Sequence, residues 1–315
     1  MIRAAAQAAL VMLSATLGCA RSAATEPPAQ GAPVPLAAST RKVPSEVAST
    51  TDAAPPGEPA APVPRPSALP SAPARPMSAR TDGAHELPLA PERTVFYARP
   101  LEGPSSSAGP RPWRLVGHLH GICHPPSYSA GRWLGAAVDV GVVVSPTGNA
   151  RCGDPSLGPP SWEAPSWEEL VATMDADLER SIAKVLAKHP GSIRREGAIL
   201  TGFSRGAFAA PVLARLHPGR WPMLVLIEAN APVTAASLRK AGVRAVAWLA
   251  GELGTEIAGE RRTDAELTSA GFPSRLFVMP RVAHLYPDEM DDLMRQAFEF
   301  VLAHEHEREP DGGAL

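Results

Sequence analysis

Aromatic residues are missing from the whole N-terminal part of the sequence. The six Trp, three Tyr and seven Phe residues all lie at or after Phe96, whereas sixteen of the 36 Pro residues fall between Pro27 and Pro91. A segment rich in Pro and Ala without aromatic side chains buries too little apolar surface to offset the conformational entropy lost on folding. We therefore expect residues 20–91 to form a disordered linker, residues 92–305 a single folded domain, and residues 306–315 a flexible tail.

The sequence also lacks an excess of charge of one sign and a long apolar run. Its 30 Lys and Arg residues against 32 Asp and Glu residues give a net charge of −2. There is no stripe of basic residues interleaved with aromatic ones, so nucleic acid is not an expected partner. No apolar run reaches the about 20 residues that a membrane-spanning helix needs.

The first nineteen residues have the features of an export signal. Arg3 precedes the mostly apolar segment 4–17, which is followed by Gly18 and Cys19. This pattern resembles a bacterial lipoprotein signal, in which a cysteine after a small residue is lipidated and becomes the new N-terminus. The resemblance implies a lipid anchor at Cys19 that attaches the protein to a membrane of the cell envelope.

Ala20 follows the cysteine, and the resemblance then implies sorting to the outer membrane, because an Asp at this position is the common retention signal. The alternative is an ordinary secretory signal cleaved near Ala20 or Ala24, which predicts a periplasmic or secreted protein. Both interpretations export the chain.

Cysteine is scarce, with only three residues in the chain. If Cys19 carries lipid, Cys123 and Cys152 remain as an even pair in an oxidising compartment, where disulfides persist. We expect a Cys123–Cys152 disulfide, and two free buried thiols are the alternative.

From Thr94 onward, strand and helix patterns alternate. Short apolar, β-branched runs predict strands, and apolar residues at helical spacing predict helices, the first of them opened by a capping box at Ser166 and Glu169. The expected strands cover 94–98, 113–118, 138–145, 197–203, 223–227, 243–250 and 276–279, and the expected helices cover 167–188, 205–216 and 289–304. This alternation predicts an α/β fold with a mostly parallel sheet and helices on both faces.

The sharpest local motif is Gly202-Phe203-Ser204-Arg205-Gly206, which matches Gly-x-Ser-x-Gly between an apolar strand and a helix of small residues. The two glycines, Gly202 and Gly206, permit the tight strand-to-helix turn that exposes the serine hydroxyl. The helix N-terminus behind it favours negative charge that develops on a substrate. Ser204 is therefore the candidate nucleophile, and an ordinary glycine-rich turn is the alternative.

At this motif the chain resembles the α/β-hydrolase superfamily, in particular small cap-less esterases of the dienelactone-hydrolase and secreted feruloyl-esterase type. The resemblance covers Thr94 to about His304 and implies a three-layer α/β sandwich that needs no cofactor. It also implies that two backbone N–H groups bind the substrate oxyanion. These belong to Ile122, after His120-Gly121, and to Arg205, after the nucleophile.

His284 is the candidate general base. It lies between the last expected strand and the closing helix, which is where the family places this residue, and the chain order of serine, acid and histidine agrees. Of the other histidines, His189 and His217 lie at expected helix ends, and His304 and His306 lie in the charged tail.

The acid that orients the base has three candidates. The family expects a carboxylate after the penultimate strand, at a position that Gly254 occupies here. We expect Glu256, two residues later, to reach back to His284. Glu252 is the second candidate and Glu228, after the preceding strand, is the third; absence of any acid is a further alternative.

The segment from His118 to His124 is dense in metal-ligand residue types, and two histidines two apart on a strand point the same way. It lacks the acidic member of a His-x-His-x-Asp-His motif, and no Cys-x-x-Cys or His-Glu-x-x-His motif is present. We therefore expect no metal.

These features together predict a serine hydrolase of carboxyl esters that acts through an acyl-enzyme on a small-molecule ester in the cell envelope. The Gly/Pro-rich stretch 146–167 is the candidate substrate loop, and its Trp162 and Trp167 are candidates for the wall of an aromatic or sugar subsite. For Trp167, the favoured alternative is that it is the first core residue of its helix. The alternatives are a serine peptidase with the same residues and a non-catalytic envelope lipoprotein that uses the fold as a binding module. The sequence gives no signal for an oligomeric state.

Overall fold

The computed structural model describes residues 81–101, 105–106, 109–110 and 112–306. Cys19, the predicted signal and most of the predicted linker lie outside the described residues. None of the described helices is both long and apolar enough to cross a membrane.

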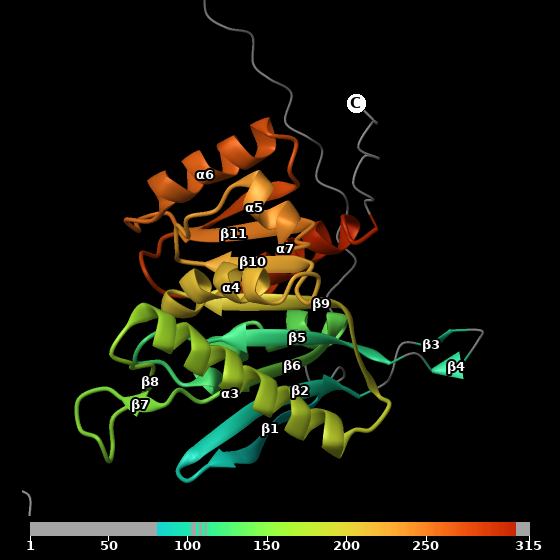
Figure 1. Ribbon diagram of the computed structural model, residues 1–315, viewed down its shortest axis with the longest axis vertical. Helices are drawn as coiled ribbons and strands as arrows, with labels where there is room; N and C mark the ends of the chain where they lie inside the picture. The colour runs from blue at the N-terminus through green and yellow to red at the C-terminus, as the bar shows by residue number, and fades with distance from the viewer. Residues whose placement is uncertain (1–80, 102–104, 107–108, 111, 307–315) are drawn as a thin grey trace, which may run out of the picture. The chain divides into compact units, whose positions relative to one another are not determined.

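An eight-stranded sheet forms the centre of the described part (Figure 1). In spatial order its strands are β1 (Thr81–Ala90), β2 (Arg93–Pro100), β6 (Gly141–Pro146), β5 (Trp113–Leu119), β9 (Ile193–Phe203), β10 (Met223–Ile227), β11 (Ala245–Gly251) and β12 (Ser274–Met279). The β1–β2 and β2–β6 pairs are antiparallel, and all other neighbours are parallel. Two short hairpins, β3–β4 (Ser105–Ser106 and Gly109–Pro110) and β7–β8 (Ala150–Arg151 and Pro160–Ser161), lie outside this sheet.

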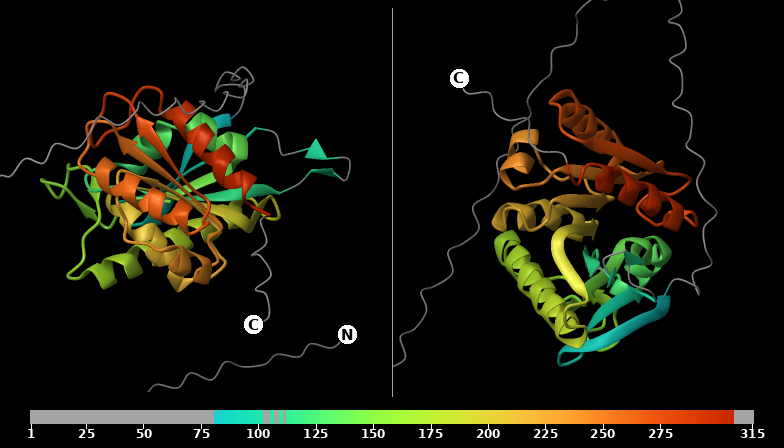
Figure 2. Two further views of the ribbon diagram at one scale, coloured as in Figure 1. Left: turned by 90° about the horizontal axis from the view of Figure 1, so that it is seen from above. Right: turned by 90° about the vertical axis from the view of Figure 1, so that its right-hand side faces the viewer.

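Helices cover both faces of the sheet (Figure 2). One apolar core joins the sheet to α3 (Trp167–Lys188), α4 (Arg205–Leu216), α5 (Ala235–Lys240) and α6 (Ile257–Ser269). A second core joins the other face to α1 (Pro126–Gly131), α2 (Leu134–Val140) and α7 (Met290–Ala303). The prediction of a three-layer α/β sandwich with a mostly parallel sheet is confirmed.

Local sequence signals account for where the best-predicted helices begin. The Ser166 hydroxyl accepts a hydrogen bond from the Glu169 amide at 3.1 Å, which satisfies one of the free N–H groups at the start of α3. Helix α4 has the predicted bounds and contains Pro211.

The predicted start of the folded domain at residue 92 is ten residues or more too late. β1 covers Thr81–Ala90, inside the range expected to be linker, and pairs with β2 along its length. Pro88 is compatible with this position because β1 is an edge strand. The composition signal failed here because the β1 sequence has few strand-forming residues and gains its structure from pairing with β2, where His85 stacks on Tyr97.

The strand predicted over 138–145 is also wrong in part. Helix α2 continues to Val140, and β6 begins at Gly141. A continuous apolar run fits a buried helix end as well as a buried strand, so its periodicity does not separate the two.

The parallel strands end at one edge of the sheet. β9 ends at Phe203 next to Ile227 of β10, and β11 ends at Gly251 next to Met279 of β12. In open α/β sheets the crevice beyond the carboxyl ends of the strands is where ligands bind. The predicted site residues follow these strand ends.

Candidate active site

Ser204 lies on the sharp turn between β9 and α4. Its backbone has φ 52° and ψ −119°, a left-handed conformation that is costly for a residue with a Cβ atom. The Ser204 amide donates to the Ile227 carbonyl at 2.8 Å, and the Ser204 carbonyl accepts from the Ala207 amide at 2.9 Å. The neighbouring strand and the first turn of α4 therefore hold the serine in this conformation.

The two glycines of the motif are required by close contacts. A Cβ atom on Gly202 would collide with the backbone of Gly206 and Ala207, and one on Gly206 would collide with the Leu119 carbonyl of β5. The turn closes only because neither position carries a side chain.

His284 approaches Ser204 from the loop after β12. Its Nε2 atom lies 2.9 Å from Ser204 Oγ, and its Nδ1 atom lies 3.2 Å from Glu228 Oε2. A carboxylate only accepts, so Nδ1 donates to Glu228 and Nε2 is left to accept from the serine hydroxyl. An imidazole held in this tautomer can take the hydroxyl proton.

Glu228 is the first residue after β10, and its side chain is 1% exposed. Its amide donates to the Leu249 carbonyl at 2.8 Å, and its Oε1 atom accepts from the Gly251 amide. Glu228 also has a positive φ of 57°. This backbone conformation and the two hydrogen bonds turn the carboxylate towards His284 rather than towards solvent.

The prediction that Glu256 contacts His284 is wrong. Glu256 Oε2 accepts from the Asn230 amide at 3.2 Å, and Glu252 Oε2 accepts from the Arg281 amide at 3.0 Å. The third candidate, Glu228, is the carboxylate that the structure brings to His284.

Gly254 explains how Glu228 takes this place. A Cβ atom built on Gly254 would lie 3.3 Å from Glu228 Oε2. The carboxylate of Glu228 thus occupies the space next to the position where the resemblance predicts an acidic side chain. The missing side chain on one turn is matched by a buried glutamate on the neighbouring turn.

Three glutamates gather behind His284. The hydrogen bond with Glu228 raises the pKa of His284, burial of the imidazole opposes this, and the charges of Glu228 and Glu256 add to the increase. Burial and the nearby charge of Glu228 raise the pKa of Glu260 to about 8, so this carboxyl is protonated at neutral pH. Glu260 Oε1 accepts from the Ala229 amide at 2.8 Å, directly after Glu228.

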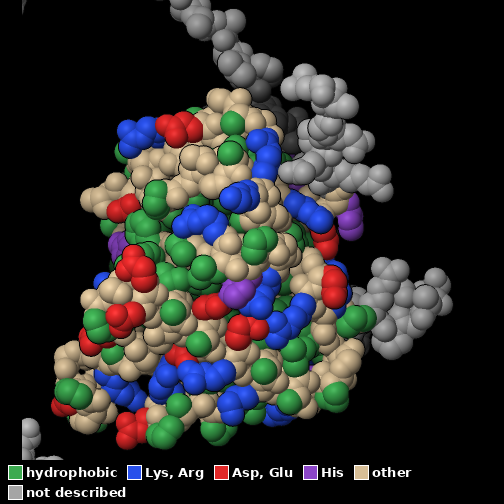
Figure 3. All heavy atoms as spheres, in the orientation of Figure 1, with side chains coloured by type: hydrophobic (Ala, Val, Ile, Leu, Met, Phe, Trp, Pro, Cys, Tyr) green, Lys and Arg blue, Asp and Glu red, His purple; other side chains and the backbone are tan. Residues whose placement is uncertain are grey.

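A groove of about 510 Å³ opens beside Ser204. Its lining includes Ile122, Trp167 of α3, Phe208 of α4 and Pro232. Hydrophobic side chains gather on the face formed by α3 and α4, with Lys and Arg side chains among them (Figure 3). Trp167 borders the groove and is 40% exposed, so the favoured core position for it is wrong. Trp162 is fully buried and stacks on His120 instead.

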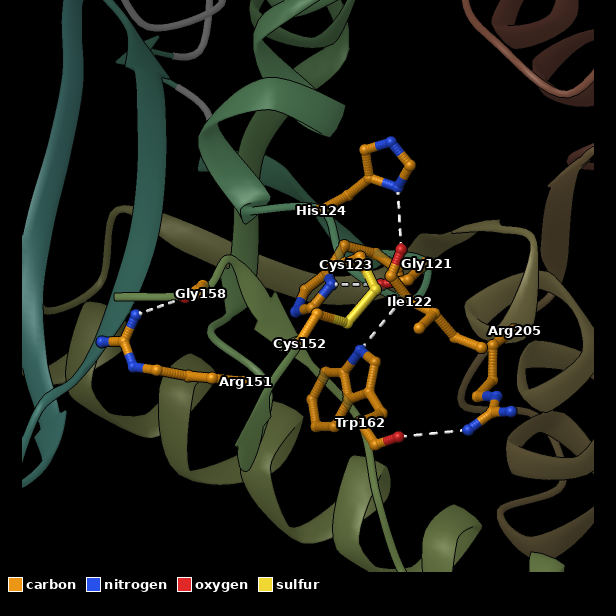
Figure 4. The surroundings of a disulfide bond; sticks show 10 residues. Gly121, Ile122, Cys123, His124, Arg151, Cys152, Gly158, Trp162 and Arg205 are labelled. Atoms are coloured by element: carbon orange, nitrogen blue, oxygen red, sulfur yellow. Dashed lines mark hydrogen bonds between the residues drawn. A yellow bond between two sulfur atoms is a disulfide. The ribbon is translucent and has the colours of Figure 1, made fainter. Parts of the chain in front are cut away.

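The predicted oxyanion residues both line this groove next to Ser204. Arg205 is the first residue of α4, so its amide has no acceptor one turn earlier in the helix. Ile122 lies on the turn after β5 and points towards Arg205 (Figure 4). The Arg205 guanidinium donates to the Trp162 carbonyl at 3.1 Å.

The predicted Cys123–Cys152 disulfide is present and holds this turn. It joins the residue after Ile122 to the loop that contains the β7–β8 hairpin (Figure 4). Trp162 adds a second connection, because its indole N–H donates to the His120 carbonyl at 3.1 Å.

His118 and His120 have separate hydrogen-bond partners. His118 contacts Thr201 and Ser129 through its two ring nitrogens, at 2.8 and 2.7 Å, and His120 Nε2 accepts from the Gly148 amide at 3.0 Å. Burial lowers the pKa of His118 to about 3 and that of His120 to about 4. Both are neutral residues that hold the end of β5 against its neighbours.

Tyr286 is a site residue that the sequence did not suggest. Its buried hydroxyl lies 2.5 Å from Ser129 Oγ, and its ring packs on Phe203 at 4.7 Å between centroids. It follows His284 by two residues and so fixes the loop that carries the base. The sequence signal was a lone tyrosine next to the candidate histidine, which is too common a pairing to identify.

No protein-family model matches the chain, and the search of curated proteins gives no match. Among solved structures, the S-formylglutathione hydrolase FrmB of Staphylococcus aureus has 11% identity and a TM-score of 0.48, covering 70% of this chain and 98% of its own. A Pyrobaculum calidifontis esterase has 13% identity and a TM-score of 0.48, covering 72% and 88%. A ferulic acid esterase has 15% identity and a TM-score of 0.47, covering 66% and 91%. The fold and the site described above rest on the strand order and hydrogen bonds of the chain itself.

Proposed function

We propose that the chain is a serine hydrolase that cleaves carboxyl esters through an acyl-enzyme on Ser204. The observation that carries the proposal is the continuous hydrogen-bonded series of Ser204, His284 and Glu228, with separations of 2.9 and 3.2 Å. A hydroxyl, an imidazole and a buried carboxylate in this order form the arrangement that activates a serine in unrelated hydrolase folds.

The reaction proceeds in two transfers of the acyl group. Ser204 Oγ attacks the ester carbonyl carbon while its proton passes to His284 Nε2, and the alcohol leaves with that proton. Water then attacks the acyl-enzyme, gives a proton to Nε2, and releases the carboxylic acid as Ser204 recovers its proton. Each turnover consumes one ester and one water and yields one acid and one alcohol.

The negative charge of each tetrahedral intermediate forms beside the N-terminus of α4. The Arg205 and Ile122 amides are the proposed donors to this oxyanion. Their preorganisation matters because donors that are already oriented need no rearrangement when the charge develops.

The raised pKa of His284 sets the acidic limit of activity. Only the neutral imidazole accepts the serine proton, so kcat/KM is expected to rise with pH as His284 loses its proton. The hydrogen bond to Glu228 is the largest cause of the raised pKa, so this limb is shifted to higher pH than the limb of an unperturbed histidine.

A non-catalytic binding module is the alternative from a different class. Its support in the sequence was Gly254 at the position of the acid. The 3.2 Å separation between Glu228 and His284 weakens that support, because it offers a carboxylate from the turn after β10 in place of the missing one. A serine peptidase would use the same residues. Hydrolysis rates of an ester and an amide of the same acyl group distinguish an esterase from a peptidase.

The test is covalent labelling of Ser204 by a fluorophosphonate, read by mass spectrometry, together with hydrolysis of nitrophenyl esters of graded chain length. We expect the label on Ser204 and ester hydrolysis that disappear together in Ser204→Ala. The control is Ser269→Ala, at an exposed serine at the end of α6. Labelling or hydrolysis that persists in Ser204→Ala contradicts the proposal.

We also propose that the enzyme acts in the bacterial envelope through a lipid anchor at Cys19. The supporting observations are the sequence before Cys19 and the Cys123–Cys152 disulfide, a bond that persists in oxidising compartments. Cys19→Ala is expected to move the protein from the detergent phase to the aqueous phase. Unchanged partitioning of that variant contradicts the anchor.

A further inference from the structure

The groove beside Ser204 is elongated along α4. Phe208, Val212 and Arg215 of its lining follow Ser204 at spacings of four, four and three residues, so they lie on one face of the helix. At 1.5 Å per residue, the ten steps from Arg205 to Arg215 cover about 15 Å. The groove therefore extends well beyond the reacting atoms.

Between its two ends the groove is apolar. Its uncharged walls come from α3, α4, the turn after β5 and the segment after β10, namely Ile122, Trp167, Phe208, Pro211, Val212, Ala231 and Pro232. The lining contains two cations, Arg205 and Arg215, and no carboxylate. A ligand that fills the groove needs an apolar body, and any charge that it carries at an end must be negative.

The two arginines differ in their partners. Arg205, at the Ser204 end, donates to the Trp162 carbonyl. Arg215, at the far end, is exposed and makes no hydrogen bond or ion pair with the residues that the structure describes. Arg215 is thus a cation at the end of an apolar groove without an anionic partner in the described chain.

The position of His284 decides which part of an ester enters the groove. The leaving alcohol must lie beside His284 Nε2 to receive its proton. His284 is not part of the groove lining, whereas both proposed oxyanion residues are. The acyl group therefore points into the groove, and the alcohol points away from it.

We propose that the groove binds an elongated apolar acyl group whose far end carries a carboxylate that pairs with Arg215. This inference rests on the serine hydrolase function proposed above. The substrate class is then the monoester of a dicarboxylic acid, with the neutral ester group at Ser204 and the free carboxylate at Arg215. Arginine suits this task because its planar guanidinium can donate two parallel hydrogen bonds to a carboxylate.

The experiment compares two series of nitrophenyl esters, from butanedioic to dodecanedioic acid, whose far end is a free carboxylate in one series and the neutral carboxamide in the other. The measured quantity is the ratio of kcat/KM between carboxylate and carboxamide at each chain length. We expect this ratio to reach a maximum of about threefold to tenfold at one chain length. That size lies between the contribution of an exposed ion pair and that of a hydrogen bond to a charged group.

Variants then test the cation. Arg215→Gln is expected to bring the peak ratio to about 1, and Arg215→Lys to keep part of it. The matched control is Arg262→Gln, an exposed arginine on α6, which should leave the ratio unchanged. Added salt should lower the wild-type ratio more than that of Arg215→Gln, because salt screens the exposed pair.

Binding to Ser204→Ala gives a readout that does not need catalysis. Trp167 lines the groove and is 40% exposed, so its fluorescence can report occupancy, with Trp167→Phe as the reference. The carboxylate ester is expected to bind more tightly than the carboxamide, and the difference should vanish when Arg215→Gln is added.

The outcomes separate this inference from the proposed function. Three results overturn the inference while Ser204-dependent hydrolysis remains. They are a ratio that does not vary with chain length, a peak that persists in Arg215→Gln, and an equal preference for a carboxylate placed on the alcohol. Failure to hydrolyse any ester overturns the proposed function, and the binding comparison then decides the assignment of the groove by itself.

Discussion

The two flanks of Ser204 are held in different ways. On one side lie His284, Glu228, Glu256 and Glu260, which we call the acid flank; hydrogen bonds to ionisable groups hold it together. On the other side lie Ile122, Cys123 and Trp162, which we call the oxyanion flank. A disulfide and an indole hydrogen bond hold that flank.

Because of this difference, we expect the two flanks to respond to different changes in the solution. The buried histidines behind the oxyanion flank, His118 and His120, have pKa values lowered to about 3 and about 4, so they stay neutral at ordinary pH. Among the carboxyl and imidazole groups of the site, those with a raised pKa are Glu260 and His284, and both belong to the acid flank. Dependence on pH should thus come from the acid flank and dependence on redox conditions from the oxyanion flank.

The largest expected effect is on the acid flank. Glu228→Gln should lower kcat by about 10³-fold to 10⁴-fold, because an amide in place of the carboxylate favours the wrong tautomer of His284. The measurement is steady-state hydrolysis of a nitrophenyl ester at a pH above the acidic limb.

Glu256→Gln is the matched control for this prediction. It removes a charge that acts on His284 only at a distance, so we expect a loss of kcat below about tenfold. If Glu256→Gln is the more damaging change, the assignment of the acid to the turn after β10 is refuted.

On the oxyanion flank, the double variant Cys123→Ser/Cys152→Ser should lower the free energy of unfolding. The bond joins residues 29 apart, and closing such a loop is worth about 3 to 4 kcal/mol in the chain-entropy account. Urea unfolding of the variant and of the wild type, each with and without reductant, measures this.

The acidic limb of the pH–rate profile should stay in place in the cysteine variant, because His284 and Glu228 do not contact the disulfide. A limb that moves when the disulfide is removed would show that the two flanks are coupled, and the comparison drawn above would not hold.

A smaller effect is expected from moving the acid between turns. Glu228→Ala should be partly rescued by Gly254→Asp, because the Gly254 Cβ position lies 3.3 Å from the place of the lost carboxylate. We expect kcat to recover by about tenfold but to stay below the wild-type kcat, because the new carboxylate orients His284 less well than Glu228 does. Gly254→Ala in the same background carries no carboxylate and should give no recovery.

The last expected effect is on stability and concerns Glu260. Its pKa is about 8 in the folded chain against an ordinary value of 4.5, so the folded state holds a proton that the unfolded state has lost between these values. Stability therefore falls as pH rises through this window and levels off above it.

Glu260→Gln removes the titration and keeps the acceptor for the Ala229 amide. We expect the variant to gain up to about 4 kcal/mol relative to wild type between about pH 5 and pH 8.5, because each unit of pKa difference corresponds to about 1.4 kcal/mol. Thermal unfolding across this range is the measurement. A stability difference that does not change with pH would mean that Glu260 titrates normally.

The sequence predicted most of the fold because its strongest signals are local. The apolar strand before Ser204, the small-residue helix after it and the Ser166 cap each determine their own element. Strand β1 was missed because an edge strand of weak strand formers takes its structure from its partner. The end of α2 was missed because a buried apolar run has no decisive period.

The acid shows why a site is harder to predict than a fold. Gly254 and Glu228 are 26 positions apart, and only the parallel register of β10 and β11 places one beside the other. A sequence signal did exist, since Glu228 is the first polar residue after a wholly buried apolar strand. Choosing it over Glu256 required the orientation of its backbone, which the sequence does not specify.

The central claim is that Glu228 is the carboxylate that orients His284. The most direct test is the titration of the His284 ring by NMR in wild type, Glu228→Gln and Glu256→Gln. The hydrogen bond to Glu228 is the largest cause of the raised pKa, and the charge of Glu256 is the smallest of those named. We predict that the pKa of His284 falls clearly in Glu228→Gln and only slightly in Glu256→Gln; an equal fall in both, or a larger one in Glu256→Gln, would contradict the account.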